Sequence, residues 1–301
     1  LKVKETRFSA RKEIILCGGA YNSPQLLELS GIGRRDILNA NGIPVLHDLC
    51  MVGENLSEHV YSPLVYEVIS GYSWNGQLRN PLGMAKIGMR WLTNHDGPAS
   101  TNTISAQTFA PATSGGKDAE LKLQIQQVST ANNRGKGKMT IDKFEGVTLA
   151  SFQICPHSRG SSHIKSQNPN DDPRMISNHF TDERDLDACL NAIKLSIKIA
   201  ETGPMANIVK RRVRLEENLS SDGDLIDYIR ATGATAYHPV GTCRIGNDPS
   251  MSVVDAHLRV HGIKGLRIAD GSVMPTIAAT NTNAICTVIG ERAADFIVND
   301  I

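Results

Sequence analysis

The sequence predicts a mixed fold, α/β plus α+β. Pieces of a parallel-sheet domain at the two ends of the chain enclose an inserted antiparallel sheet with helices on one side. A short apolar run at residues 13–17 ends in Gly18-Gly19, which is typical of a buried parallel strand that meets a turn. The middle of the chain alternates apolar and polar residues, as antiparallel strands with one solvated face do. We therefore expect three segments, 1–60, 61–230 and 231–301, with the first and last belonging to one domain.

The composition is that of an ordinary globular protein. The 301 residues include 40% hydrophobic and 21% charged residues, and the formal net charge is +1. This near-neutral balance argues against nucleic acid or an anionic membrane surface as the main partner. No apolar run approaches the roughly 20 residues of a membrane span.

Cysteine usage indicates the redox compartment. Six cysteines are dispersed without a Cys-x-x-Cys pair, and several lie in apolar runs. This pattern favours reduced, buried thiols, and so a cytoplasmic protein without a metal site. No signal peptide is visible, but the chain begins Leu1-Lys2-Val3 and reads as if it starts inside a domain.

The segment after the first apolar run predicts a helix and a glycine-rich turn. Ser23-Pro24 marks the helix start, with Pro24 near the first helical position, and Gly31 and Gly33 end the helix. Gly31-Ile32-Gly33 is not a dinucleotide-binding fingerprint, because no strand precedes it and Asp36 stands where a third glycine should be. The true fingerprint, a strand followed by Gly-x-Gly-x-x-Gly, is absent from the whole sequence.

The middle of the chain predicts strands and helices by their periodicity. Expected strands are 61–69, 121–128, 147–156 and 158–164, and expected helices are 78–93, 182–201 and 222–230. The helix at 182–201 is amphipathic, and its acidic amino end suits the helix dipole.

One more helix is expected to begin after Asn283 and to run to about Val298. Gly290 would permit close packing of this helix. Its inward stripe would consist of Ile285, Val288, Ile289 and Phe296.

Two polar residues far apart in the chain offer chemistry. A histidine such as His238, fixed by the proline that follows it, can take a proton near neutral pH, since an unperturbed imidazole has a pKa of about 6.5. Asn281 can hydrogen-bond an oxygen whose charge changes during a reaction. The helix that starts near Thr282 would direct its positive end at whatever lies beside both residues. Composition alone leaves a plainer alternative open, a core histidine and a helix-capping asparagine.

Three ordered segments resemble signatures of the glucose–methanol–choline (GMC) oxidoreductases, the flavin-dependent alcohol oxidases and dehydrogenases. The first is residues 19–33, GAYNSPQLLELSGIG. The second is residues 52–59, VGENLSEH, in which Glu58 replaces the usual aspartate. The third is YHPVGT at 237–242, followed by GLRIADGSVMPT at 265–276 and by Asn281. The Ser-Arg-Gly-Ser strand that begins at Ser158 also resembles a strand of that family's substrate domain.

This resemblance implies a Rossmann-like FAD-binding domain, of which 1–60 and 231–301 form part, and a substrate-binding domain at 61–230. It implies oxidation of an alcohol to an aldehyde or ketone, with hydride going to the flavin N5. His238 would be the catalytic base, and Asn281 would hydrogen-bond the substrate oxygen. Because Asn281 stands where some relatives carry histidine, the choline dehydrogenase-like branch is favoured.

The resemblance also implies which residues contact FAD. The amino end of the last helix would stabilise negative charge on the reduced flavin, and backbone groups elsewhere would contact the ribityl, pyrophosphate and nucleotide parts. Asp270 has an alternative role as a turn cap, and His59 is interpreted as a structural histidine near the flavin. The expected cofactor-binding residues are Gly18, Gly19, Ala20, Ala269, Asp270, Thr282 and Asn283.

Two alternatives stay open. A hydroxynitrile-lyase-type relative would keep the flavin and the base without redox turnover. An inactive fragment or subunit would need a partner, such as the amino-terminal half, to supply the dinucleotide-binding turn. The expected partners of an active enzyme are a small-molecule alcohol and an electron acceptor, either a quinone, a dye-like carrier or oxygen, with a dehydrogenase favoured over an oxidase.

Overall fold

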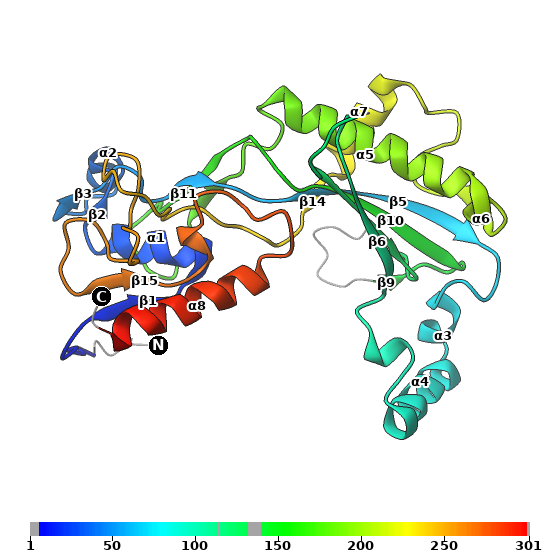
Figure 1. Ribbon diagram of the computed structural model, residues 1–301, viewed down its shortest axis with the longest axis horizontal. Helices are drawn as coiled ribbons and strands as arrows, with labels where there is room; N and C mark the ends of the chain where they lie inside the picture. The colour runs from blue at the N-terminus through cyan, green and yellow to red at the C-terminus, as the bar shows by residue number, and fades with distance from the viewer. Residues whose placement is uncertain (1–5, 114, 132–139, 300–301) are drawn as a thin grey trace. The chain divides into compact units, whose positions relative to one another are not determined.

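The computed structural model describes residues 6–113, 115–131 and 140–299, which form two compact units (Figure 1). Unit 1 contains the described residues of 1–59, 156–181 and 237–301, and unit 2 contains those of 60–155 and 182–236. The mixture of parallel and antiparallel sheets agrees with the predicted fold class. One segment differs from the expected division, because residues 156–181 belong to unit 1 and not to the inserted segment.

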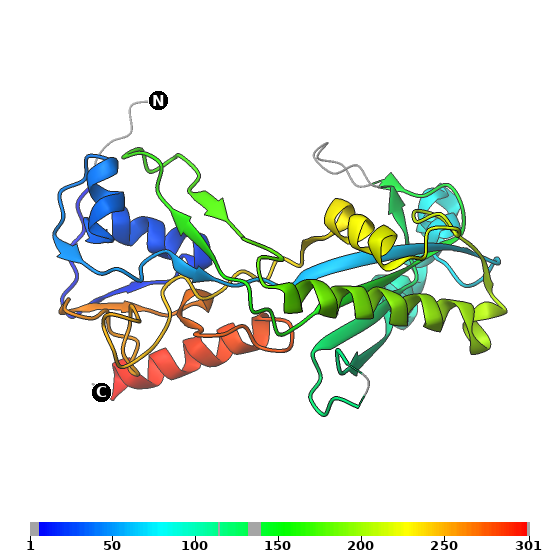
Figure 2. The same cartoon turned by 90° about the horizontal axis from the view of Figure 1, so that it is seen from above.

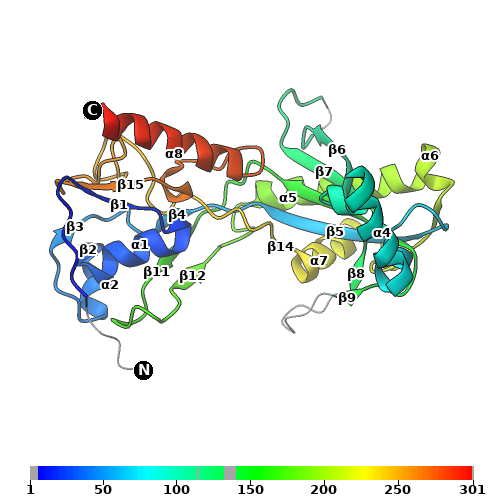
Figure 3. The ribbon, with the colours of Figure 1, turned by 90° about the horizontal axis from the view of Figure 1, so that it is seen from below.

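Unit 1 has a parallel strand pair between two helices. Strand β1 (Ile14–Leu16) pairs with β15 (Leu266–Ile268), and the register joins Ile14 to Leu266. Helices α1 (Gly19–Leu29) and α8 (Asn283–Val298) lie on opposite sides of this pair (Figures 2 and 3). The core between them includes Leu27, Ile268 and Phe296.

The remaining elements of unit 1 are short. The parallel pair β2–β3 and the antiparallel sheet β12-β11-β4 complete its strands. The bounds are β2 (Ile32–Gly33), α2 (Arg35–Ala40), β3 (His47–Asp48), β4 (Glu54–Leu56), β11 (Gly160–His163), β12 (Arg174–Ile176) and the 3₁₀ helix η2 (Gly271–Val273).

The start of α1 corrects the sequence prediction. The helix begins at Gly19, so Pro24 lies inside it and not at its first position. A proline has no N–H for the carbonyl four residues earlier, here that of Ala20. The buried Thr242 hydroxyl donates to this carbonyl at 2.6 Å instead, which satisfies the group that Pro24 leaves open. The sequence could not reveal this partner, which is 222 positions away.

Two apolar surfaces of unit 1 are more exposed than the sequence predicts. Ile14 and Ile15 in β1 are 54% and 41% exposed, although a parallel strand was expected to be buried. Val288, which we expected on the inward stripe of α8, is 54% exposed, and nothing lies within 4 Å of the position that a Cβ on Gly290 would take. Parallel strands are normally covered on both faces, so these surfaces lack a cover within the described residues.

Unit 2 is built on an antiparallel sheet of six strands, in the order β13-β5-β10-β7-β6 with β14 also paired to β5. The longest pairing is in register from Gly146↔Glu67 to Gln153↔Val60. The bounds are β5 (Val60–Val68), β6 (Ile104–Ala110), β7 (Leu121–Gln126), β10 (Gly146–Gln153), β13 (Val209–Arg212) and β14 (Ala234–Thr235).

Helices of unit 2 cover one face of its antiparallel sheet. Helices α5 (Glu183–Glu201) and α7 (Asp222–Thr232) lie along one face, as expected (Figure 1). The predicted acidic amino end of α5 is present, with Asp182 as its capping residue. The other short elements are α3 (Asn75–Arg79), α4 (Pro81–Asn94), η1 (Pro98–Ser100), β8 (Thr130–Ala131), β9 (Thr140–Ile141) and α6 (Gly203–Ala206).

The cysteines are more exposed than predicted. All six are free thiols, but of these Cys189 and Cys243 alone are buried, whereas Cys17 and Cys50 are exposed. Among the described residues no group of histidine, cysteine and carboxylate side chains is placed to hold a metal ion. None of the described helices combines the length and the apolar character needed to cross a bilayer.

Candidate active site

Within unit 1, two of the segments with recognisable motifs run side by side. Residues 52–59 lie antiparallel to residues 238–242, and Ser57 and Val240 exchange both backbone hydrogen bonds at 2.9 and 3.0 Å. The Gly53 amide also donates to the Thr242 carbonyl at 2.9 Å. This short ladder brings the end of one segment, His59, against the beginning of the other, His238.

His238 lies at the centre of a chain of three polar side chains. Its Nε2 is 3.2 Å from Nδ2 of Asn281, and its Nδ1 is 3.2 Å from Nδ1 of His59. Asn281 is exposed, His238 is half-buried and His59 is fully buried. The two residues that the sequence singled out as a possible pair are therefore in contact, and their catalytic roles stay a prediction.

The backbone at His238 is held by its neighbours. Its N–H donates to the buried carboxylate of Glu58 at 2.5 Å. The preceding Tyr237 adopts the left-handed region with φ 62°, a conformation that costs free energy for a residue with a Cβ. The proline at 239 fixes the dihedral on the other side. The direction of the imidazole is thus set by the fold rather than by the side chain alone.

Gly241 is required by close packing in this loop. Its φ is 95°, and a Cβ there would lie 2.5 Å from the carbonyl oxygen of Asn55. The Asn55 amide donates to the carbonyls of Gly241 and Pro275, both at 3.2 Å. Arg159 in turn donates to the Asn55 side-chain oxygen at 3.2 Å, which ties the Ser-Arg-Gly-Ser segment to the same loop.

Asp270 joins the end of β15 to the start of α1. One carboxylate oxygen accepts from the Gly19 amide at 3.0 Å and from the Ser23 hydroxyl at 2.6 Å. The other accepts from the Ser272 amide at 2.7 Å, so Asp270 does cap a turn, the alternative considered from the sequence. Contact between Asp270 and a cofactor remains a prediction.

The other predicted cofactor-binding residues near α1 and β15 differ in how accessible they are to a ligand. Gly18 is exposed, and Gly19 has φ 77° with no atom within 4 Å of a Cβ placed on it. Ala20 is buried with its carbonyl bound to Thr242, and the Ala269 amide donates to Leu16. The open surface at this turn is therefore the backbone of the two glycines.

Two helix amino ends fit the negatively charged and electron-rich parts of FAD. The first turns of α1 and α8 contain no acidic side chain, and neither Gly18 nor Thr282 caps its helix with a side-chain hydrogen bond. The helix dipole at such ends favours phosphate and other partial negative charge, although at α1 the Gly18 and Gly19 amides already donate to Ser23 and to the carboxylate of Asp270. A glycine face without Cβ atoms at α1 and the exposed Asn281 and Asn283 at α8 leave room for such a ligand.

A charged cluster lies between α1, β4 and β11. Nδ1 of His163 contacts the fully buried carboxylate of Glu28 at 2.7 Å, and its Nε2 lies 3.3 Å from Glu54, which also pairs with Arg34. Burial alone would lower the pKa of His163, but hydrogen bonds to Glu28 and Glu54 outweigh it and raise the pKa to about 9. The hydrogen bond from His163 in turn holds the pKa of Glu54 below its ordinary value.

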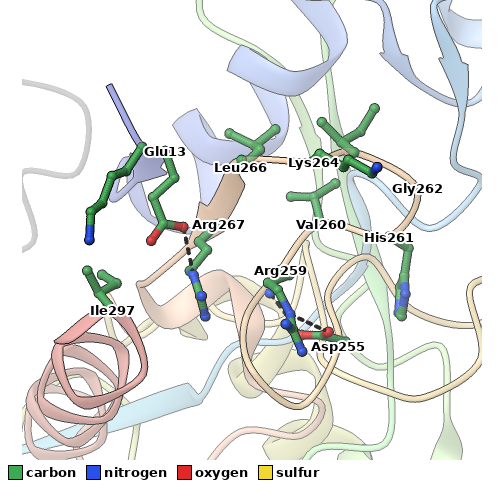
Figure 4. Close-up of a pocket in the computed structure, with 13 residues that line it drawn as sticks. Glu13, Asp255, Arg259, Val260, His261, Gly262, Lys264, Leu266, Arg267 and Ile297 are labelled. Carbon is green, nitrogen blue, oxygen red and sulfur yellow. Dashed lines mark hydrogen bonds and ion pairs between the residues drawn. The ribbon is translucent and has the colours of Figure 1, made fainter. Parts of the chain in front are cut away.

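A hollow of about 680 Å³ lies at the other end of the parallel strand pair (Figure 4). Glu13 and Arg267 form an ion pair of 2.7 Å on its wall, and Arg259 pairs with Asp255 at 2.9 Å. These residues precede β1 and β15 or lie near their amino ends. Ligands of open α/β sheets bind at the carboxyl ends of the strands, where Gly18 and Asp270 lie, so we do not assign this hollow as the active site.

The arrangement of these residues is typical of α/β enzymes that bind a nucleotide cofactor. An α/β unit has an imidazole–amide pair and two helix amino ends whose N-cap residues make no side-chain cap, and the loop after His238 packs on the turn that follows β15. Such a site suits proton transfer beside a bound nucleotide cofactor.

Comparisons with known proteins identify the family. Two family models described as GMC oxidoreductase match the chain, one over residues 2–61 and the other over residues 156–290. The chain belongs to the GMC oxidoreductase family, whose members bind FAD.

Relatives and solved structures agree. The chain is 34% identical to oxygen-dependent choline dehydrogenase 1 of Chromohalobacter salexigens, over 98% of this chain and 52% of the relative. It is 35% identical to oxygen-dependent choline dehydrogenase of Escherichia coli O157:H7, over 97% of this chain and 51% of the relative. The formate oxidase of Aspergillus oryzae superposes with a TM-score of 0.89 at 28% identity, over 97% of this chain and 55% of that one. The chain thus spans about half the length of the curated relatives that it matches.

His59 and Glu58 are the residues that sequence reasoning undervalued. We interpreted His59 as structural, yet its ring nitrogen contacts His238 directly. Glu58 drew attention solely as a departure from the usual aspartate, yet it accepts the His238 amide. The signal available in the sequence was their position at the end of a recognised motif, and it did not say which other motif they would meet.

Proposed function

We propose that this chain forms part of an FAD-dependent enzyme that oxidises an alcohol to an aldehyde or ketone, with His238 as the base. The observation that carries the proposal is the contact of His238 Nε2 with Asn281 Nδ2 at 3.2 Å, immediately before the uncapped amino end of α8. Membership of the GMC family and the similarity to enzymes named choline dehydrogenase and formate oxidase support it.

FAD, when bound, supplies the hydride acceptor for this chemistry. A substrate hydroxyl that enters between His238 and Asn281 can replace their mutual hydrogen bond with two of its own. It donates its proton towards Nε2 of His238, and its oxygen accepts from Nδ2 of Asn281. His238 holds the hydroxyl proton at Nε2 while the carbinol hydrogen leaves as hydride, so the substrate loses a proton and a hydride to separate acceptors.

Residues of this chain would hold the cofactor from two sides. Backbone amides at the amino end of α8, near Thr282 and Asn283, are suited to the electron-rich edge of the flavin. At the start of α1, Gly18 and Gly19 carry no side chain, which lets the phosphate-bearing part approach, although their amides already donate to Ser23 and Asp270. Asp270 positions that turn through its hydrogen bonds to Gly19 and Ser23.

A second candidate is favoured by the exposed apolar surfaces of unit 1. The chain would be inactive until a dinucleotide-binding segment, in the same or another polypeptide, covers β1 and the outer face of α8. The exposed Ile14, Ile15 and Val288 support this need. The glycine fingerprint that holds a pyrophosphate is absent from the sequence, which gives the same indication.

The test uses the purified protein that contains this chain, mixed anaerobically with a panel of alcohols that includes choline while flavin absorbance is followed. The enzyme should lose its yellow colour with at least one alcohol, and His238→Ala should slow this reduction by ~10²–10⁴ while flavin stays bound. Reduction at an unchanged rate in His238→Ala would remove His238 from the mechanism. Cleavage of a hydroxynitrile without any bleaching would indicate a lyase. A colourless chain that turns yellow solely on addition of a dinucleotide-binding segment would support the second candidate.

A further inference from the structure

We propose that His59 is a positioning residue that holds His238 in one tautomer, with the proton on Nδ1 and the lone pair on Nε2. The inference rests on the proposed function insofar as it takes His238 to be the base. A base whose lone pair faces away from the substrate cannot accept its proton, so the tautomer decides whether the residue works.

The first support is the distance between the two rings. Nδ1 of His59 and Nδ1 of His238 are 3.2 Å apart, and the rings meet edge to face with an interplanar angle of 88°. Two unprotonated nitrogens at that distance would repel, and two protonated ones would clash. One of them therefore carries a hydrogen and donates it to the other.

Asn281 decides which of the two rings donates. The amide nitrogen of Asn281 can only donate, and it faces Nε2 of His238 at 3.2 Å. Nε2 must then accept, so a neutral His238 carries its hydrogen on Nδ1 and donates it to His59. The two neighbours of His238 thus require the same tautomer from opposite sides of the ring.

Burial restrains the side chain of His59 next to the ring of His238. Its side chain is fully buried, and it lies at the end of the backbone ladder that joins Ser57 to Val240. Glu58, next to it, accepts the backbone N–H of His238, so ring and backbone are held from the same short segment. When His238 takes a proton from the substrate, a neutral His59 continues to accept from Nδ1, which is now a stronger donor.

Loss of the acceptor has a definite cost. Without His59 the tautomer of His238 depends on the hydrogen bond from Asn281 alone, so the other tautomer becomes more accessible, and the charged imidazolium formed during reaction loses the acceptor of its Nδ1 hydrogen. We expect flavin reduction to slow by about 10- to 100-fold in His59→Leu. In His59→Asn an amide oxygen can stand near the former Nδ1 position, and reduction should return to within about 5-fold of the unsubstituted rate, since the net contribution of such a hydrogen bond is largely restored.

The experiment uses the FAD-bound protein that contains this chain, labelled with ¹⁵N in its histidines. The nitrogen shifts of His238, assigned by their loss in His238→Ala, should show Nδ1 protonated and Nε2 unprotonated in the resting protein and in His59→Asn. His59→Leu should show a mixture. Flavin absorbance checks that cofactor binding is unchanged. His95→Asn is the matched control, because His95 has φ 55° at the end of α4, where asparagine fits, and it lies in unit 2.

The outcomes separate this inference from the proposed function. Protonation of Nε2 in the resting protein would overturn the inference, and this measurement is made on the unsubstituted protein. So would a His59→Asn variant as slow as His59→Leu. A protein that shows the expected tautomer but bleaches with no alcohol would refute the proposed function alone.

Discussion

The charged cluster around His163 makes a quantitative prediction about stability and pH. We consider His163→Gln, which keeps a polar side chain but removes the charge. The side chain of His163 is 11% exposed, so water screens its contacts with Glu28 and Glu54 little. Raising a pKa from 6.5 to about 9 corresponds to about 3 kcal/mol of folding free energy, at about 1.36 kcal/mol for each pH unit.

The sign of the pH dependence follows from the direction of the pKa shift. The folded-state pKa lies above the unfolded one, so the stabilisation is complete below about pH 6.5 and is lost as the pH rises through about 9. The charged groups that face His163 are Glu28 and Glu54, with Arg34 paired to Glu54. The substitution should therefore cost about 3 kcal/mol at pH 6 and less than about 1 kcal/mol near pH 10.

Hydrogen exchange gives a local readout. The Ile164 amide donates to Glu28 at 2.8 Å, so exchange of this amide, corrected for its intrinsic rate, reports opening of the cluster. His95→Gln on the surface of unit 2 is the control and should show no such pH dependence. An equal loss of protection at pH 6 and pH 10 in His163→Gln would refute the reasoning, because the contribution would then not depend on charge.

Two further predictions concern packing in the loop around His238. Gly241→Ala should destabilise unit 1 by about 3 kcal/mol or more, because the new Cβ meets the Asn55 carbonyl. The control Gly71→Ala has a similar φ of 97° but open space around the new Cβ, so it should cost about 1–2 kcal/mol. Equal losses of unfolding free energy for the two variants in urea would contradict this prediction. Thr242→Val should lower the free energy of unfolding by about 1–3 kcal/mol, because it leaves the Ala20 carbonyl without its hydrogen bond. The loss should be smaller in a Pro24→Ala background, where the backbone N–H of residue 24 can donate to this carbonyl. A double-mutant cycle that shows no coupling between the two positions would rule this out.

Periodicity predicted the elements well because it depends on nearby residues. The helix at Glu183–Glu201 and the strands β5, β7 and β10 lie close to where the alternation placed them, whereas β6, β13 and β14 were not predicted. Periodicity does not say what covers an apolar face, and so it wrongly buried Ile14, Ile15 and Val288. Burial of an apolar side chain needs another segment that packs on it, and the periodicity of one segment does not reveal that partner.

In the candidate site, too, local motifs could be predicted from the sequence and long-range contacts could not. The motifs gave His238 and Asn281 as a possible pair, and the structure brings them into contact. The contact with His59 joins positions 179 apart, and the one between Thr242 and Ala20 joins positions 222 apart. Contacts of this kind depend on how loops return, which a single sequence does not encode in any local pattern. The membership of residues 156–181 in unit 1 could not be read from its strand-like pattern for the same reason.

The division of the chain also sets an order for folding during synthesis. Unit 1 consists of three stretches separated by the two stretches of unit 2, and the chain passes between the units four times. All of unit 2 has left the ribosome once residue 236 has emerged, whereas Gly19 and Ser23 must wait for Asp270 and His59 must wait for His238. Residues 6–59 are thus exposed to chaperones and proteases until residues 237–299 have emerged. A nascent chain arrested before residue 237 would carry a finished antiparallel sheet and an unfinished unit 1.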